Sequence, residues 1–306
     1  MTDAAARPPA RPRSVPVLIG GAEMGEIDEA AQRLGLTADA LMESAGAMAS
    51  ELALTELSRL GEPISGPGGA LSGAPLVAVL CGPGNNGGDG FVVARRLAAV
   101  GRRVLCILVA DASRLRSPAA AHNWMVLQAM ASAGSLELFV APTPELLLRL
   151  RPQLAEATLL IDALLGSGAS GPLREPISSA VDVLNAVRTH AQADGRPCAV
   201  LAIDTPTRID LTGGGQSDPV VRADLTVTFH RAKAGFALDA TARRLAGRYF
   251  VAPIGIPLEA ERDIVPPDGE FPPARITQIT WGEPSSPDEP GRARPGDGIG
   301  AGPGIE

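Results

Sequence analysis

The stretch Leu76–Gly90, LVAVLCGPGNNGGDG, decides the fold of this 306-residue chain. Its first six residues are apolar without alternation, which is typical of a strand covered on both faces of a parallel sheet. Phe91–Val100 then has the apolar spacing of a helix. Glycines between a strand and a helix let backbone N–H groups approach an anion, and the helix N-terminus adds positive potential. The stretch therefore predicts a strand, a ligand-binding turn and a helix.

The same alternation of strand and helix continues along the chain. Further apolar runs predict strands at Val104–Val109, Leu136–Val140, Thr158–Leu165, Cys198–Asp204, Leu225–Phe229 and Tyr249–Ala252. Helical spacing occurs at Thr37–Leu60, where Thr37 is the expected N-cap, and at Pro118–Ala133, Pro144–Leu154 and Pro176–Ala191. This order predicts an α/β fold with three layers, in which helices flank a doubly wound, mostly parallel sheet.

Glycine and proline divide the chain into three parts. They make up 17 of the 41 residues in Pro266–Glu306, which exceeds the roughly 25–30% typical of low-complexity segments. We therefore expect a disordered N-terminal segment (residues 1–14), a folded domain (15–258) and a disordered tail (259–306). A weaker linker, Gly61–Ala74, lies within the folded part.

Composition excludes several classes of function. The net charge of −7 argues against nucleic-acid binding, which requires a basic surface. No run of 18 apolar residues occurs, and no apolar segment follows the first arginines, so we expect neither a membrane span nor a signal peptide. Cys81, Cys106 and Cys198 lie far apart in apolar runs, which predicts buried, reduced thiols in a cytoplasmic protein.

Candidate functional residues follow three of the predicted strands. Ligands of a doubly wound sheet bind beyond the carboxyl ends of its strands. The segments richest in Gly, Asp and Asn at such ends are Gly82–Gly90, Asp162–Pro172 and Asp204–Asp210. Asp162 and Asp204 are candidates for acid–base catalysis or cation binding, because each carboxylate emerges from a buried strand. The alternative for each is a structural brace of a loop or helix.

Several segments, taken in chain order, carry a family resemblance. They are MESAG at Met42–Gly46, GPGNNGGDG at Gly82–Gly90, DALLGSG at Asp162–Gly168 with GPLREP after it, DTPT at Asp204–Thr207, ADLTVTF at Ala223–Phe229 with Lys233–Gly235, and Ile254–Pro257. Together they resemble the NAD(P)H-hydrate epimerase family (the YjeF N-terminal domain), over about residues 15–258. The resemblance implies a Rossmann-like domain that epimerises the C6 hydroxyl of hydrated NADH or NADPH and binds K⁺.

The resemblance also implies site residues by motif position. The hydrated dinucleotide would contact Asn85, Asn86, Gly87, Gly88, Asp89, Gly166, Ser167, Gly168, Ala169, Ser170, Gly171, Pro172 and Asp204. Potassium would be held by Asn86, Asp162 and Thr207, whose oxygen ligands suit a hard cation.

The chemistry of the implied substrate calls for a carboxyl group. C6 of the hydrate carries a hydroxyl beside the ring nitrogen, so protonation of this hydroxyl lets the nitrogen expel water. Water that adds to the other face of the resulting planar iminium inverts the centre, with acid–base assistance in both steps. We expect Asp162 to donate and accept the proton. Asp89 and Asp204 are the alternatives if Asp162 only binds the cation.

Three residues depart from the family's pattern. Ser44 replaces an asparagine, Gly25 replaces an arginine, and Arg208 replaces the glycine that follows the serine position, here Thr207. A large cation at Arg208 puts potassium binding in question, whereas the fold is unaffected. The only lysine, Lys233, falls in the family's Lys-x-Gly segment. It has either a functional ammonium group there or a surface position at a strand end.

Two other functions remain open at this stage. Gly82, Gly84 and Gly87 satisfy GxGxxG, and Asp111 after the next strand is a candidate ribose acceptor, which is a weak signal for an NAD-dependent dehydrogenase. No substrate domain of adequate length follows, which argues against it. The departures also fit a non-catalytic nucleotide-binding or scaffold module. The epimerase hypothesis leaves a homodimer open, and a separate dehydratase would act on the product because this chain is too short to contain one.

Overall fold

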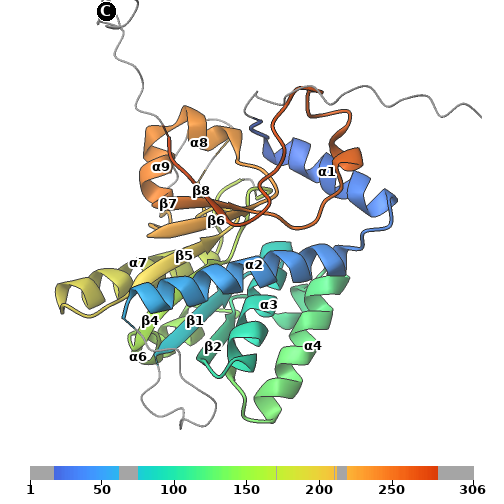
Figure 1. Ribbon diagram of the computed structural model, residues 1–306. Helices are drawn as coiled ribbons and strands as arrows, with labels where there is room; N and C mark the ends of the chain where they lie inside the picture. The colour runs from blue at the N-terminus through green and yellow to red at the C-terminus, as the bar shows by residue number, and fades with distance from the viewer. Residues whose placement is uncertain (1–16, 62–74, 170, 210, 212–218, 282–306) are drawn as a thin grey trace, which may run out of the picture.

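A computed structural model describes residues 17–61, 75–169, 171–209, 211 and 219–281. These residues form one eight-stranded sheet with the order β3-β2-β1-β4-β5-β6-β7-β8 (Figure 1). Neighbouring strands are parallel throughout, except that β8 is antiparallel to β7. The strands are β1 (Leu76–Cys81), β2 (Arg103–Leu108), β3 (Glu137–Val140), β4 (Ala157–Ala163), β5 (Ala199–Ile203), β6 (Leu225–Phe229), β7 (Arg248–Ala252) and β8 (Thr277–Ile279).

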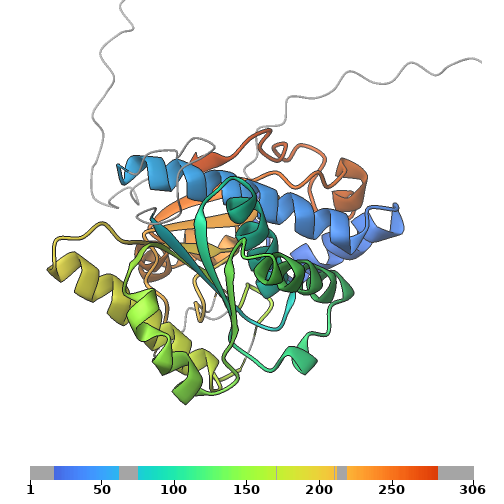
Figure 2. The ribbon, with the colours of Figure 1, turned by 90° about the horizontal axis from the view of Figure 1, so that it is seen from below.

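Helices cover both faces of this sheet (Figure 2). One face carries α1 (Gly21–Arg33), α2 (Ala38–Arg59), α3 (Asn85–Ala99) and α4 (Pro118–Ser132); the other carries α5 (Pro144–Arg149), α6 (Arg151–Leu154) and α7 (Ile177–Ala193). The short α8 (Ala234–Leu238) and α9 (Ala240–Ala246) pack beside β7. In β1, Val77 and Val79 belong to one core and Ala78 and Leu80 to the other. The unbroken apolar strands thus have two buried faces, which confirms the predicted three-layer α/β class.

Helix boundaries agree with the sequence at most ends and differ at two. The Thr37 side chain caps α2 as expected, accepting a hydrogen bond from the backbone N–H of Ala40. In contrast, α3 begins at Asn85 rather than at Phe91, so the glycine-rich segment forms the first turns of the helix. The stretch Pro144–Leu154, expected as one helix, is divided at Leu150 into α5 and α6.

The fold continues beyond the boundary expected at Leu258. A 3₁₀ helix, η2 (Leu258–Glu261), packs against α1, and β8 then adds an antiparallel edge to the sheet. Glu261 is buried, and its carboxylate pairs with the His230 ring and the Arg231 guanidinium. This buried charge cluster holds the chain after β7 against the sheet, so residues 259–281 are not part of a disordered tail. Residues 1–16 and 282–306 lie outside the described part of the chain.

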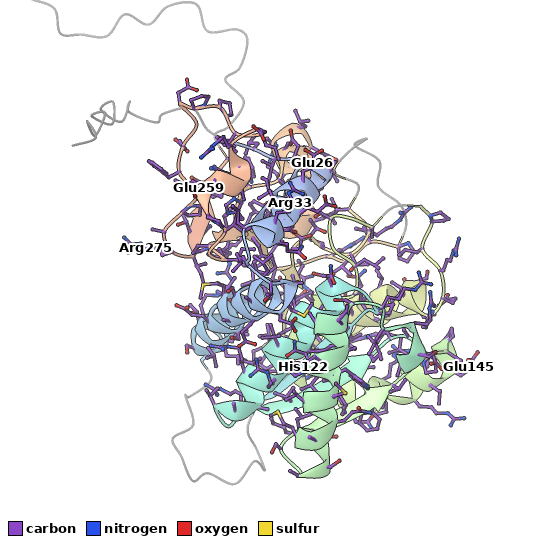
Figure 3. All side chains as sticks on the ribbon, turned by 90° about the vertical axis from the view of Figure 1, so that its right-hand side faces the viewer. Glu26, Arg33, His122, Glu145, Glu259 and Arg275 are labelled. Carbon is purple, nitrogen blue, oxygen red and sulfur yellow. The ribbon has the colours of Figure 1, made fainter. Side chains whose placement is uncertain are left out.

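Charged and polar side chains cover the outside of the helices, and the cysteines are buried as the composition predicted. Polar and charged side chains such as Arg33, His122 and Glu145 point away from the helices that carry them (Figure 3). Within the described ranges, no helix has the length and apolar character that crossing a bilayer requires. The three cysteines are buried free thiols.

Close packing requires glycine at the start of α3. A Cβ on Gly87 would lie 1.8 Å from the carbonyl oxygen of Gly82, and one on Gly90 would lie 2.5 Å from the Cβ of Ala163. These contacts let the first turns of α3 lie directly against the ends of β1 and β4. By comparison, a Cβ on Gly84, the N-cap of α3, would meet nothing within 4 Å.

The substitution Gly87→Ala is therefore expected to destabilise the protein by about 1–3 kcal/mol, the usual cost of overpacking a closely packed site. Gly84→Ala is the matched control and should change the free energy of unfolding by less than about 0.5 kcal/mol. Urea denaturation of both variants measures the difference. Equal stabilities would show that α3 does not need this close approach.

Candidate functional site

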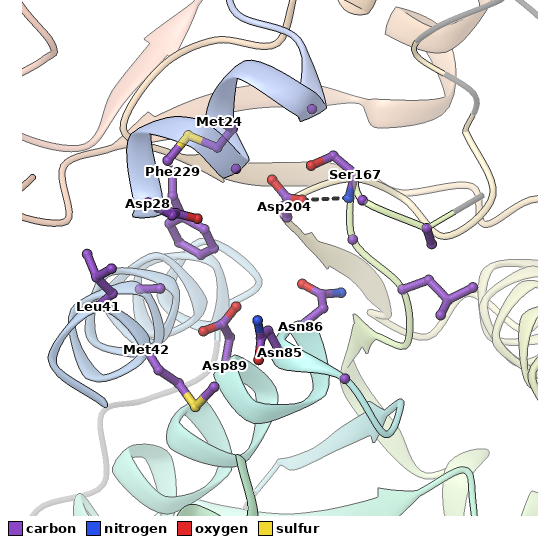
Figure 4. A pocket seen from close by; sticks show the side chains of 18 of the residues that line it. Met24, Asp28, Leu41, Met42, Asn85, Asn86, Asp89, Ser167, Asp204 and Phe229 are labelled. Carbon is purple, nitrogen blue, oxygen red and sulfur yellow. Dashed lines mark hydrogen bonds between the residues drawn. The ribbon is translucent and has the colours of Figure 1, made fainter. Parts of the chain in front are cut away.

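A cavity of about 510 Å³ opens at the carboxyl ends of β1, β4 and β5 (Figure 4). Its walls come from α1 and α2 on one side, the first turns of α3 below, and the loop after β4 on the other side. This is the edge at which ligands of doubly wound sheets bind. Among its lining residues are Met24, Asp28, Leu41, Met42, Asn85, Asn86, Asp89, Gly166, Ser167, Gly168, Ala169, Asp204, Phe229 and Lys233.

Three carboxyl groups and one ammonium group face this first cavity. Asp28 comes from α1, Asp89 from α3 and Asp204 from the end of β5, so the chain brings them together from three separate segments. Lys233, which follows β6, is 2% exposed. Its Nζ lies 3.7 Å from Oδ1 of Asp204. Among the described residues the cavity therefore holds more acidic than basic groups, and it favours a ligand part that is neutral or positively charged.

Asp204 is held in one orientation and kept ionised. Oδ2 accepts a hydrogen bond of 2.7 Å from the backbone N–H of Ser167, and Oδ1 accepts one of 3.1 Å from the Thr228 hydroxyl. Burial favours the neutral carboxyl, but the Lys233 ammonium and these donors together hold the pKa of Asp204 below its usual value. The residue has a positive φ of 64°, which turns the chain sharply at the strand end.

The other two acids of the first cavity favour their neutral forms. Burial raises the pKa of Asp28 to about 6, an effect that Lys233 opposes and Asp204 reinforces. Burial also raises the pKa of Asp89 well above its ordinary value, with smaller contributions from the charges of Asp204 and Asp28. Carboxyl groups of this kind can hold a proton near neutral pH, which is the property a general acid needs.

Asp162 lies beneath the loop and lines neither this cavity nor the second one described below. Its side chain is 0% exposed. The carboxylate accepts hydrogen bonds from the backbone N–H and the hydroxyl of Thr207, both 2.7 Å, and from the N–H of Leu164 at 3.2 Å. Burial raises its pKa to about 6 against these donors. This placement does not support the proton exchange with substrate expected of Asp162; the residue joins the loops after β4 and β5.

A second cavity of about 790 Å³ adjoins the first. The segment Gly166–Ala169 lines both, so this loop is the partition between them. Arg114, Arg174 and Arg208 line the second cavity. Among the described residues that line it, the carboxylate is that of Glu175, which accepts a hydrogen bond from the backbone N–H of Ser179 in the first turn of α7. Guanidinium groups in this number suit a phosphorylated ligand part.

Arg208 reaches across the loop. Its Nη1 donates a hydrogen bond to the carbonyl oxygen of Gly171. The backbone φ of Arg208 is +83°, in the left-handed region that favours glycine. This conformation gives a physical reason for the glycine of the family's pattern at this position. Asp210, the other partner considered for Arg208, lies outside the described residues.

The structure brings most of the predicted binding residues to the two cavities. Asn85, Asn86, Asp89, Asp204 and the segment Gly166–Ala169 line the first, whereas Gly171 and Pro172 line the second. Gly87 and Gly88 are buried beneath the first cavity, and their backbones form the helix start. Ser170 lies outside the described part of the chain.

Two further positions have only local roles. The Ser44 hydroxyl donates to the Ala40 carbonyl within α2. Asp111 is exposed, and its carboxylate accepts hydrogen bonds from the backbone and the side chain of Ser113. The carboxylate expected to meet a ribose in a dehydrogenase is thus engaged in a turn.

Sequence reasoning missed the wall that α1 and α2 supply. Asp28, Met24, Leu41 and Met42 line the first cavity, but they precede the first strand and follow no strand end. The signal available was the resemblance of these helices to the family, in MESAG at Met42–Gly46 and in the departure at Gly25. It gave no role to Asp28.

Residues 38–235 match the family described as YjeF-related protein N-terminus. The chain belongs to the YjeF N-terminal family. A protein of Cenarchaeum symbiosum named NAD(P)H-hydrate epimerase is 34% identical over 248 residues, which cover 79% of this chain and 97% of that protein. A Pyrobaculum aerophilum protein named bifunctional NAD(P)H-hydrate repair enzyme Nnr is 37% identical over 246 residues, and the chain spans 43% of its length.

A solved structure supports the fold of the YjeF N-terminal family for this chain. The crystal structure of the yeast protein ynu0 (YNL200c) has a TM-score of 0.66 and 22% identity. The similarity covers 86% of this chain and all of the yeast chain. At 22% identity, this comparison shows that the two chains share a fold and no more.

Asp28→Asn is expected to stabilise the protein at pH 7. With a pKa of about 6 in the folded state and 3.8 as the ordinary value, Asp28 keeps its proton in the folded protein between these pH values while the unfolded chain releases it. The stability of the wild type therefore falls as pH rises through this window. Asparagine does not ionise, so the variant gains about 1–3 kcal/mol at pH 7 and nothing below pH ~4.

Urea denaturation of both proteins at the two pH values measures this gain. Glu26→Gln, at an exposed position of the same helix (Figure 3), is the control and should behave as wild type. An unchanged difference between pH 4 and pH 7 would contradict the raised pKa of Asp28.

Proposed function

We propose that the protein interconverts the R and S epimers of the C6 hydrates of NADH and NADPH. The observation that carries this function is the pair of adjoining cavities on either side of Gly166–Ala169, one lined by three carboxyl groups and the other by three arginines. The first takes the hydrated nicotinamide ring, and the second takes the phosphorylated remainder of the dinucleotide. The family and the names of the full-length relatives agree with this assignment.

The charge of the first cavity suits the chemistry of the hydrate. Loss of water from C6 converts a neutral ring into an iminium cation. The ionised Asp204 and the acids of α1 and α3 stabilise this positive charge where it develops, which is the main source of catalysis in many enzymes. Phe229 and Met24 give the same cavity an apolar surface for the ring.

The second cavity and the loop between the cavities bind the anionic part. In the loop, the backbone N–H of Ser167 donates to Asp204 and that of Ala169 donates to the Gly166 carbonyl, so Gly166 and Gly168 supply the backbone donors for phosphate oxygens. Arg174 and Arg208 add charge on the far side of the loop. The linings of the two cavities set the orientation of the substrate, because a dinucleotide bound the other way round would place its phosphates against three carboxyl groups.

Potassium would be held by Asn86 at the first cavity together with Asp162 and Thr207 beneath the loop behind it. Asn86 is 9% exposed, and within the described residues neither polar atom of its side chain has a hydrogen-bond partner. A carboxylate on Asp162 and the oxygens of Thr207 complete an oxygen-only set, which suits a hard cation. When bound there, potassium would supply positive charge that fixes the two loops and the substrate phosphates. The Arg208 guanidinium donates a hydrogen bond to the Gly171 carbonyl and does not occupy the proposed potassium position.

We also propose a cellular location, a partner enzyme and an assembly state for this protein. We place the protein in the cytoplasm, in agreement with its buried free thiols. A separate dehydratase that consumes the epimer is part of the same proposal, and the Pyrobaculum aerophilum relative is named a bifunctional repair enzyme. Assembly as a homodimer is part of the same proposal.

The epimerase assay tests this function directly. The wild type, incubated with one resolved epimer of NADPH hydrate, should form the other faster than the enzyme-free solution does, as followed by chromatography. Arg208→Gly, which also suits the positive φ, should raise KM about tenfold or more because a charged hydrogen bond to phosphate is lost. Nucleotide binding without interconversion would favour a non-catalytic module, and hydride transfer would favour a dehydrogenase.

Potassium binding is tested by thermal unfolding without substrate. Tm of the wild type should be higher in KCl than in choline chloride at equal ionic strength, because an ion bound only to the folded state adds about 2.7 kcal/mol at 100 times its Kd. Asn86→Ala should remove this difference. Equal Tm values of the wild type in the two salts would exclude the potassium site.

A further inference from the structure

Inversion at C6 sets a geometric requirement, given the proposed epimerase function. Water must leave from one face of the ring and return to the other. A carboxyl group fixed on one wall reaches only one face of a ring that does not turn over. The first cavity is lined by acids on more than one wall, which removes the need for the ring to turn (Figure 4).

Two of the four buried or half-buried acids near the site have other roles. Asp204 accepts hydrogen bonds from Ser167 and Thr228 and lies beside Lys233, so it stays ionised and has no proton to donate. Asp162 lies outside both cavities and accepts three hydrogen bonds from backbone and hydroxyl groups. Asp28 and Asp89 are therefore the two acids that remain as candidates for proton exchange with the substrate.

Asp28 and Asp89 have the position and the chemical state for proton exchange. Asp28 enters the cavity from α1, above the open space in Figure 4, whereas Asp89 enters from α3, below it. In the part of the chain that the structure describes, no hydrogen bond or short ion pair engages either side chain. Both carboxyl groups are thus available to a ligand.

The charged groups around Asp28 come from each element that meets α1. Lys233 after β6 favours its ionised form, and Asp204 after β5 favours its neutral form. Asp89 on α3 and Asp28 oppose each other's ionisation. From η2, Glu261 is paired with His230 and Arg231. This repulsion favours a state in which one of the two acids is neutral while the other is charged.

We propose that Asp28 and Asp89 act as a pair of catalytic acids and bases, one for each face of the hydrated ring. The neutral acid gives its proton to the C6 hydroxyl. The C6–O bond then breaks, water leaves with the bonding electrons, and the lone pair of the ring nitrogen forms the C=N bond. A water on the opposite face adds to C6, returns the electron pair to nitrogen and loses a proton to the other carboxylate.

The step balances without any other reactant. One water leaves and one is added, and no electrons are exchanged with a cofactor. The proton has moved from one aspartate to the other, so the enzyme is ready for the reverse direction, and exchange with solvent resets it. Each epimer therefore has its own acid.

Oxygen exchange with labelled water separates the two roles. Each resolved epimer of NADPH hydrate is incubated in H₂¹⁸O with wild type, Asp28→Asn or Asp89→Asn, and both epimerisation and ¹⁸O content are measured above the enzyme-free rate. We expect each variant to lose epimerisation by about 10²-fold or more. Each should still exchange oxygen with retention in one epimer only, and the two variants should retain opposite epimers.

The controls keep the test decisive. Glu26→Gln on the exposed side of α1 should epimerise as wild type does. Titration with NADP⁺ and the Tm of each aspartate variant establish that binding and folding persist. If wild type epimerises and either variant does so equally, or both variants exchange the same epimer, the paired mechanism is wrong. A wild type without epimerisation would instead overturn the proposed function on which this inference rests.

Discussion

The buried ion pair between Lys233 and Asp204 joins the parts from which the site is built. Asp204 holds the loop between the two cavities through the backbone N–H of Ser167. On the other side, Lys233 forms a β-bridge with Ile19 just before α1, and its N–H donates to the hydroxyl of Tyr249 on β7. Removal of either charge would leave the other buried without its partner, which is strongly unfavourable. The wall formed by α1 therefore depends on this pair.

The four acids at this edge of the sheet show how environment gives one residue type several roles. Asp204 has a cation and two donors, so it remains charged in a buried place. The Asp162 carboxylate accepts hydrogen bonds from Thr207 and Leu164 and thereby joins the loops after β4 and β5. Asp28 and Asp89 are desolvated without such partners, and they hold protons more tightly. Burial alone does not distinguish these roles; the hydrogen-bond donors do.

The fold and the strand-end half of the site could be predicted because they depend on local patterns. Unbroken apolar runs identified the parallel strands, and the sheet rule placed Asp204 at its edge. The start of α3 at Asn85 was missed because glycine disfavours helices, a preference that contacts such as Gly87 on Gly82 override here. Asp28 was missed because only tertiary packing brings α1 to the cavity. The short β8 was hidden in a segment rich in glycine and proline.

The opposite charges of the two cavities explain how one loop can serve both binding and catalysis. In the proposed binding mode, phosphates on the arginine side of Gly166–Ala169 would fix the dinucleotide away from the reacting carbon. The ring on the acidic side would be neutral before and after the proposed reaction and positive only in between. Interactions with Asp204 are therefore strongest near the transition state, which raises the rate instead of tightening substrate binding. The separation by one loop lets the anion-binding side strengthen binding without neutralising the acids that the reaction needs.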